Sequence, residues 1–166
     1  MAIEVREAVP EEYAAAGAVT AGAYREFQGP EHDWEDYLEE IADVGERATR
    51  TTILIAVEDG RILGSLTLEL EGRVSFEPGR DRLDPGEAHV RMLGVDPSAR
   101  RSGVARLLMA DAEARALEAG KTRMTLHTAP PMIAAQRFYE GLGFERQPVE
   151  VFPDGFTLLS YAKQLV

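Results

Sequence analysis

A short turn rich in arginine carries the clearest chemistry in the sequence: Arg100-Arg101-Ser102-Gly103-Val104-Ala105-Arg106. It follows a predicted strand and runs directly into a predicted helix. The first amides of a helix have no intrahelical acceptor and lie at the positive end of the helix dipole, so they bind phosphate oxygens. Gly103 and Ala105 are small enough to let an anion approach the backbone, and the arginines add positive charge. A pyrophosphate fits this turn, although an ordinary strand-to-helix connection with solvated arginines explains the local residues equally well.

The spacing of this turn excludes two common phosphate motifs. The sequence contains no G-x-x-x-x-G-K-[ST], and the turn does not have the spacing G-x-G-x-x-G. ATP-binding and dinucleotide-binding loops of those types therefore lose support.

The elements that position the turn belong to an intermingled pattern of strands and helices, which favours one mixed α/β domain over residues 1–166. The strand before the turn runs from Ala88 to Val95 and the helix after it from Ser102 to Ala119. Asp59-Gly60 between two apolar runs predicts a hairpin. The other predicted elements are a first strand within Met1 to Pro10, helices from Pro10 to Tyr24 and from the N-cap Asp33 to about Gly45, hairpin strands at Ile53 to Val57 and Ile62 to Leu70, a long loop from Glu71 to Glu87, a strand from Arg123 to Thr128, a helix from Pro130 to Gly141 or Gly143, and a final strand from Phe156 to Tyr161.

The composition indicates an acidic, ordinary soluble protein of 166 residues with net charge -11. Such a surface repels nucleic-acid phosphates, and it either favours cationic substrates such as amines or serves solubility. The absence of cysteine rules out disulfides and a cysteine nucleophile and is compatible with the cytoplasm. The three histidines have no metal-ligand spacing, so no metal is expected. No apolar run is long enough to span a membrane, and the first residues lack a secretory signal pattern.

Two motifs in order resemble those of the GNAT superfamily of N-acetyltransferases. Arg100-x-x-Gly103-x-Ala105 matches the family's turn of Gln or Arg, two residues, Gly, one residue, and Gly or Ala. Ala135-Gln136-Arg137-Phe138-Tyr139-Glu140-Gly141-Leu142-Gly143-Phe144 is similar to the family's A-x-x-F-Y-x-x-x-G-F segment. The resemblance covers the chain from about Ile53 to Phe144.

The resemblance implies a central, mostly antiparallel twisted sheet of six to seven strands, splayed between the fourth and fifth strands and flanked by about four helices. It implies acetyl-CoA as the acyl donor, bound at this splay, with the backbone of the fourth strand pairing with the pantetheine arm and the turn holding the pyrophosphate. Met132 stands where many members carry an asparagine, so one hydrogen bond to the cofactor is lost. The cofactor-binding residues implied are Leu93, Gly94, Val95, Arg100, Arg101, Ser102, Gly103, Val104, Ala105 and Arg106.

The implied reaction is acetyl transfer to a primary amine of a small molecule or peptide by direct attack, without a covalent enzyme intermediate. Tyr139 matches the family's usual general acid, and its alternative role is a core aromatic. His89 stands where many relatives carry a glutamate base, and histidine titrates near neutrality. Glu69, Glu87 or a water are competing bases, and the two glutamates are more readily interpreted as solvated carboxylates beside a loop. His127 either packs in the core or lines the splay.

By the same resemblance, the first two helices and the loop from Glu71 to Glu87 shape the acceptor site. Four aromatic side chains there could wall a pocket: Tyr24, Phe27, Trp34 and Tyr37. Alternatively, Trp34 and Tyr37 pack the second helix onto the sheet. A non-catalytic acyl-CoA-binding regulator or interaction module is the alternative function, because it would keep the turn without a productive base. The resemblance also allows a homodimer.

Overall fold

The structure is a computed structural model that describes residues 2–28, 34–72, 82–148, 150–151 and 157–166. Three predicted features lie outside these residues: the helix cap Asp33, residues 73–81 of the long loop, and Phe156 at the start of the final strand.

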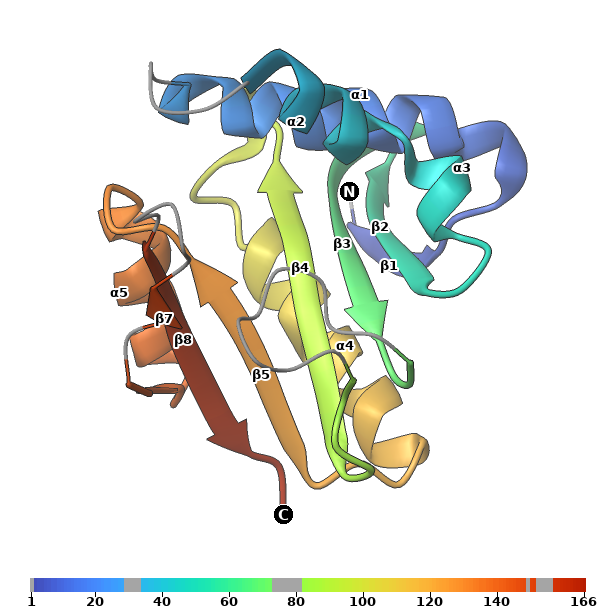
Figure 1. Cartoon of the computed structure of the whole chain (residues 1–166). Helices are drawn as coiled ribbons and strands as arrows, with labels where there is room; N and C mark the ends of the chain where they lie inside the picture. The colour runs from blue at the N-terminus through green and yellow to red at the C-terminus, as the bar shows by residue number, and fades with distance from the viewer. Residues whose placement is uncertain (1, 29–33, 73–81, 149, 152–156) are drawn as a thin grey trace. The chain divides into compact units, whose positions relative to one another are not determined.

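The chain divides into two compact units. The first comprises Met1–Leu68 and Met92–Ala112, and the second comprises Glu69–Arg91 and Glu113–Val166. Three elements contribute residues to both units (Figure 1). They are strand β3 (Arg61–Glu69), whose last residue belongs to the second unit, strand β4 (Glu87–Val95) and helix α4 (Val104–Glu118).

The first unit combines antiparallel strands with helices. Its strands are β1 (Glu4–Glu7), β2 (Thr52–Glu58) and β3 (Arg61–Glu69), and β2 pairs antiparallel with both neighbours. Its helices are α1 (Tyr13–Tyr24), α2 (Trp34–Ala42) and α3 (Val44–Arg47), with 3-10 turns at Pro10–Glu12, Arg25–Phe27 and Pro97–Ala99. The β2–β3 turn has left-handed backbone at Asp59 (φ 52°) and Gly60 (φ 78°), as a two-residue hairpin requires, which confirms the prediction from these two residues.

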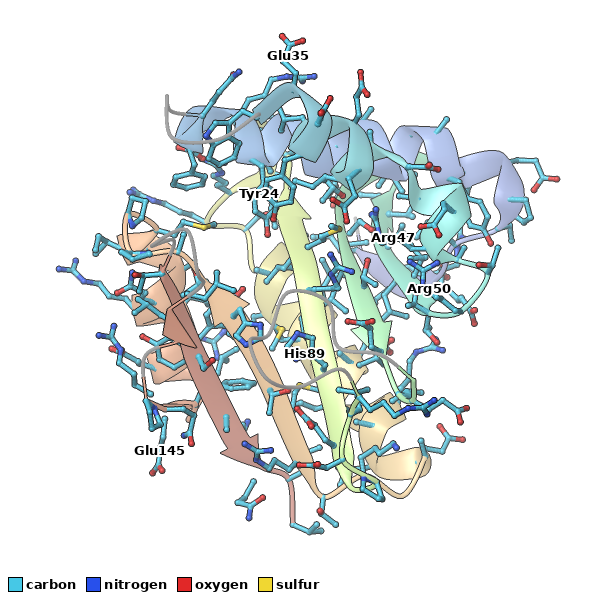
Figure 2. The ribbon with its side chains drawn as sticks, viewed as in Figure 1. Tyr24, Glu35, Arg47, Arg50, His89 and Glu145 are labelled. Carbon is cyan, nitrogen blue, oxygen red and sulfur yellow. The ribbon has the colours of Figure 1, made fainter. Side chains whose placement is uncertain are left out.

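A buried arginine closes the end of α2. Arg47 is only 3% exposed and lies between α3 and the strands in Figure 2. Its guanidinium donates hydrogen bonds to the carbonyls of Glu40 (2.7 Å) and Ile41 (2.8 Å) and to the Thr67 hydroxyl (3.3 Å). The last carbonyls of a helix lack intrahelical donors, and a buried charge is tolerated only where it is hydrogen-bonded. Arg47 therefore satisfies both needs and ties α2 to β3.

Helices α1 and α2 approach so closely that only glycine fits at one position. A Cβ atom at Gly17 would lie 2.0 Å from the carbonyl oxygen of Ala42. We therefore expect Gly17→Ala to lower the free energy of unfolding by about 2 kcal/mol or more, because a backbone carbonyl cannot move without shifting α2. Urea denaturation measures this loss.

Gly22, in the same helix, is the matched control. A Cβ atom there meets only the Arg25 Nη1 atom, at 4.0 Å. Gly22→Ala should stabilise by about 0.5–1 kcal/mol, because alanine restricts the unfolded chain and favours helix. Equal effects of the two substitutions would contradict the close approach of α1 and α2.

The second unit is a smaller sheet with one further helix. Its remaining elements are β5 (Arg123–Thr128), α5 (Ile133–Gly141), β6 (Glu145–Arg146), β7 (Glu150–Val151) and β8 (Thr157–Gln164). β4 pairs parallel with β5 from Glu87↔Arg123 to Val90↔Leu126, and β5 pairs antiparallel with β8. Hydrogen-bonded neighbours follow the order β1-β2-β3-β4-β5-β8-β6, and β7 pairs with β8.

Tyr161 joins α5, β6 and β8 from the centre of this unit. The side chain is fully buried. Its hydroxyl donates to the Glu140 carboxylate (2.7 Å) and accepts from Arg146 (3.0 Å). Arg146 also donates to the Gln136 side-chain oxygen (3.0 Å). A buried hydroxyl with partners on both sides stabilises the packing of α5 on the sheet.

The predicted α/β fold is confirmed. Strand Arg123–Thr128 has the predicted bounds, and α5 begins at Ile133, after the predicted Pro130 start. The described residues form eight strands and five α-helices, against the expected six to seven and about four. The additional elements are the two-residue strands β6 and β7 and the one-turn helix α3.

Candidate functional site

The predicted phosphate turn lies in the first unit and adopts a backbone that demands glycine. Arg100 is extended, Arg101 has φ 65° and Gly103 has φ 85°. A Cβ atom at Gly103 would meet nothing within 4 Å, so the space in front of the turn is open. The left-handed region favours glycine, and the Arg101 backbone is strained there.

The start of α4 presents amides to this open space. The first helical hydrogen bond runs from the Leu107 N–H to the Gly103 carbonyl (3.0 Å). Across the described ranges, no acceptor faces the amides of Val104, Ala105 and Arg106. Free amides at a helix start bind anions, so the local geometry fits the predicted pyrophosphate.

The polar side chains of the turn are partly engaged within the protein. The Arg100 guanidinium forms an ion pair with Glu26, and both groups are about half exposed. The Ser102 hydroxyl donates back to the Ala99 carbonyl, so it stabilises the turn. Arg101 and Arg106 are exposed. An anion at this turn would therefore compete with Glu26 for Arg100.

The end of β4 contains the predicted pantetheine-pairing residues Leu93, Gly94 and Val95. Met92, just before them, has φ 53°, a left-handed conformation that costs about 1–3 kcal/mol in a residue other than glycine. Gly94 lies against α1, because a Cβ atom there would be 3.1 Å from the Thr20 Cα atom. Strained backbone of this kind is common at binding sites. The pairing of this backbone with a ligand stays a prediction.

The predicted base His89 lies on β4 within the second unit, where Figure 2 labels it. It is 2% exposed, and its Nδ1 atom is 2.8 Å from the Thr125 hydroxyl of β5. That hydroxyl donates to the Glu87 carboxylate (2.5 Å), whose other oxygen accepts the Asp84 N–H (3.1 Å). The His127 ring lies 5.0 Å from the His89 ring. His89 therefore belongs to a buried hydrogen-bonded series of side chains with Thr125 and Glu87.

The interpretation of the two competing glutamates as solvated carboxylates is wrong. Glu69 is 4% exposed and Glu87 is 1% exposed. Glu87 is buried because it lies in register beside β5 and finds the Thr125 hydroxyl there, a partner 38 residues away. Thr125 itself was missed by sequence reasoning. Strand alternation places Glu87 and His89 on one face, but only the β4–β5 register shows what faces them.

The predicted acid Tyr139 lies on α5 in an aromatic cluster of the second unit. Its ring centroid is 5.5 Å from Phe138, 6.0 Å from Phe144 and 6.3 Å from Tyr161. Tyr139 is 7% exposed, and its hydroxyl makes no hydrogen bond with any residue that the structure describes. Burial raises the pKa of the Tyr139 phenol well above its usual value. The phenol is thus a protonated donor that has no acceptor within the described part of the chain.

Tyr139 and His89 belong to the same compact unit but to opposite faces of its sheet. The register pairs His89 with Thr125 and Val90 with Leu126, which in turn pairs with Tyr161. Successive side chains of a strand point to opposite faces. Since Tyr139 packs against Tyr161, it lies on the face opposite to His89.

The other predicted site residues have structural contacts. Tyr24 and Tyr37 pack against the core formed by Ala21, Leu38, Ile41 and Met92, and Trp34 packs on Tyr37 at 5.7 Å, which favours the packing interpretation. Met132 is the N-cap residue of α5. Among the described residues, no cluster of three or more potential ligands could hold a metal ion. No described helix has the length and apolarity to cross a bilayer.

Comparison with known proteins identifies the family. Residues 17–144 match the model of the Acetyltransferase (GNAT) family. Because this match covers well over half of the sequence, the chain belongs to the GNAT acetyltransferase family. No curated protein sequence matches it significantly.

Solved structures share the fold at low sequence identity. PaiA N-acetyltransferase from Thermoplasma acidophilum, in complex with coenzyme A, has a TM-score of 0.74 and 17% identity and covers 99% of each chain. A GNAT-family acetyltransferase from Staphylococcus aureus has a TM-score of 0.75 at 18% identity, over 99% of this chain and 100% of the other. YncA from Salmonella typhimurium, with its cofactor acetyl-CoA, has a TM-score of 0.69 at 19% identity, over 100% of this chain and 95% of the other.

Proposed function

We propose that the protein transfers an acetyl group from acetyl-CoA to a primary amine of a small molecule or peptide, by direct attack. The observation that carries this proposal is the start of α4 in a chain of the GNAT family: amides that have no acceptor among the described residues follow a left-handed glycine there. We also place this reaction in the cytoplasm, because a cysteine-free chain suits a reducing compartment.

The turn and the end of β4 would hold the acyl donor. The amides from Arg101 to Arg106 would bind its pyrophosphate, and the exposed arginines would add charge. The backbone from Leu93 to Val95 would pair with its pantetheine arm. When bound, acetyl-CoA supplies the activated acetyl thioester.

Two side chains of the second unit, one on each face of its sheet, would move protons, with the amine approaching from the face of His89 and the leaving sulfur from the face of Tyr139. An ammonium must lose a proton before its nitrogen can attack, and His89 would accept that proton. The leaving sulfur needs a proton, and the Tyr139 phenol would donate it, since burial raises its pKa and keeps it protonated. The acidic surface, with net charge -11, would favour cationic acceptors.

The direct test is turnover with a broad panel of amines. Purified protein incubated with acetyl-CoA should release free CoA thiol and give an acceptor heavier by one acetyl group in mass spectra. Thermal stabilisation by CoA without turnover on any amine would instead favour a non-catalytic acyl-CoA-binding module. If CoA gave no thermal stabilisation and no amine gave turnover, the proposal would be refuted.

The Arg100–Glu26 ion pair predicts an unusual gain of affinity. In the wild type, Arg100 must break its ion pair with Glu26 before it can bind a phosphate, and an exposed ion pair contributes about 0.2–1 kcal/mol. Glu26→Gln removes this cost and should therefore tighten CoA binding by up to about fivefold. Calorimetric titration measures this gain. Glu35→Gln on α2, an exposed glutamate in Figure 2, changes the net charge equally and should leave the affinity unchanged. Equal effects of both variants would show that only net charge matters.

A further inference from the structure

We infer that Glu87, acting through the Thr125 hydroxyl, holds the proton of neutral His89 on Nδ1 and so leaves the lone pair on Nε2. Glu87 and Thr125 are then positioning residues for a base. This inference rests on the proposed function for its catalytic meaning. The tautomer itself is independent of that function.

The direction of the hydrogen bonds follows from counting protons. The Thr125 hydroxyl has one proton, and it donates that proton to Glu87 Oε2 at 2.5 Å. The Thr125 oxygen can therefore only accept from His89 Nδ1, which lies 2.8 Å away. Nδ1 must carry the imidazole proton, and in neutral histidine the other nitrogen then carries the lone pair.

Glu87 sets this direction because it acts as an acceptor at both carboxylate oxygens. Oε2 accepts the Thr125 hydroxyl, and Oε1 accepts the Asp84 N–H at 3.1 Å. Since both oxygens of Glu87 are acceptors in these contacts, the donors run from His89 to Thr125 to Glu87.

The three hydrogen-bonded side chains are buried, which strengthens the hydrogen bonds between them. Glu87, His89 and Thr125 are 1%, 2% and 7% exposed. Water cannot easily replace these hydrogen bonds, and hydrogen bonds in a low-dielectric interior strengthen one another. The parallel register also pairs His89 directly with Thr125, so two strands hold the geometry rigidly.

The tautomer is measurable without any substrate. The chain has three histidines, so a 15N-histidine sample gives a simple long-range 1H–15N correlation spectrum. At about pH 9, well above the usual pKa of histidine, neutral imidazoles dominate. His89→Gln and His127→Gln spectra assign the signals of the two neighbouring rings. We expect protonated Nδ1 and unprotonated Nε2 at His89, and the reverse pattern would overturn the inference.

Glu87→Gln should reverse the pattern. With its oxygen still accepting the Asp84 N–H, the glutamine would turn its NH2 group toward Thr125. The Thr125 oxygen would then accept, its own proton would turn toward His89 Nδ1, and the ring proton would move to Nε2. Glu145→Gln, an exposed glutamate of β6 in Figure 2, is the matched control and should change nothing. We call the hydrogen-bond series from His89 through Thr125 to Glu87 the relay. An unchanged His89 tautomer in a folded Glu87→Gln protein would refute it.

Kinetics supply the second readout. Glu87→Gln should lower kcat about 10- to 100-fold, because the His89 proton then occupies Nε2, the nitrogen that must accept a proton. The KM for acetyl-CoA should stay within about twofold of the wild-type value, because the turn before α4 is intact. Thr125→Val should act similarly, and Thr125→Ser should restore kcat because it keeps the hydroxyl. If Thr125→Val folds poorly, the Glu87→Gln and Thr125→Ser proteins still decide the question.

The two readouts separate the failure of the relay from the failure of the proposed function. A tautomer that switches in a protein without acetyltransferase activity supports the relay and refutes the function. Turnover that is unchanged in Glu87→Gln, with an unchanged tautomer, supports the function and refutes the relay. If the His89 tautomer switched in Glu87→Gln while kcat stayed unchanged, Glu87 and Thr125 would have no role in positioning a catalytic base.

Discussion

Ala105→Glu is expected to weaken CoA binding roughly 100-fold or more while leaving the fold intact. Ala105 is the second residue of α4, beside the amides that have no acceptor among the described residues. A carboxylate there would repel a diphosphate, and one such repulsion at about 6 Å contributes about 3 kcal/mol near a protein surface. Acidic residues in the first turn of a helix are otherwise favourable, so the free energy of unfolding should be unchanged or up to about 0.5 kcal/mol higher.

This substitution separates binding from folding more cleanly than a change at Gly103. Any side chain at Gly103 would strain a backbone with φ 85°, so lost binding there could reflect a damaged turn. Ala110→Glu is the control, because it adds the same charge at an exposed position of the same helix. Calorimetric titration with CoA should show a near-normal affinity for Ala110→Glu. Tight binding by Ala105→Glu would exclude the turn as the pyrophosphate site.

The turn could be predicted from the sequence because its determinants are local. Helix amides, a glycine and adjacent arginines act within seven consecutive residues, and the backbone at Gly103 agrees with them. The same holds for Asp59-Gly60, where two consecutive residues decide the hairpin. Most strands and helices were likewise predicted to within a few residues, since alternation and helical periodicity are local signals.

The surroundings of His89 could not be predicted, because they depend on strand register. A shift of the β4–β5 pairing by one residue would move Thr125 to the other face and leave Glu87 without its partner. Nothing in the sequence near Glu87 indicates that register. The prediction of a solvated Glu87 carboxylate followed from the local residues and is wrong, because Glu87 is buried. The ion pair between Glu26 and Arg100 is also invisible in the sequence, since the two residues lie on separate elements.

Tyr139→Phe is expected to lower kcat about 100-fold or more without loss of stability. General acids contribute about 10²–10⁴-fold, and the KM for acetyl-CoA should change little because the phenol acts on the reacting sulfur. The hydroxyl has no hydrogen-bond partner among the described residues, so its removal breaks no hydrogen bond to any of them. Burial raises the pKa of the phenol, so wild-type kcat should not fall through Tyr139 ionisation at any pH below about 10.

Tyr161→Phe is the matched control, because it removes a second buried hydroxyl 6.3 Å away in ring-centroid distance. That hydroxyl bonds Glu140 and Arg146, so its loss should lower the free energy of unfolding by about 1–2 kcal/mol and leave kcat nearly unchanged. The two variants thus separate stability from activity: Tyr139→Phe should be stable but slow, and Tyr161→Phe should be destabilised but active. A Tyr139→Phe protein that is destabilised yet retains kcat would mean that Tyr139 serves only the aromatic core, and the proton for the leaving sulfur would then have to come from another group.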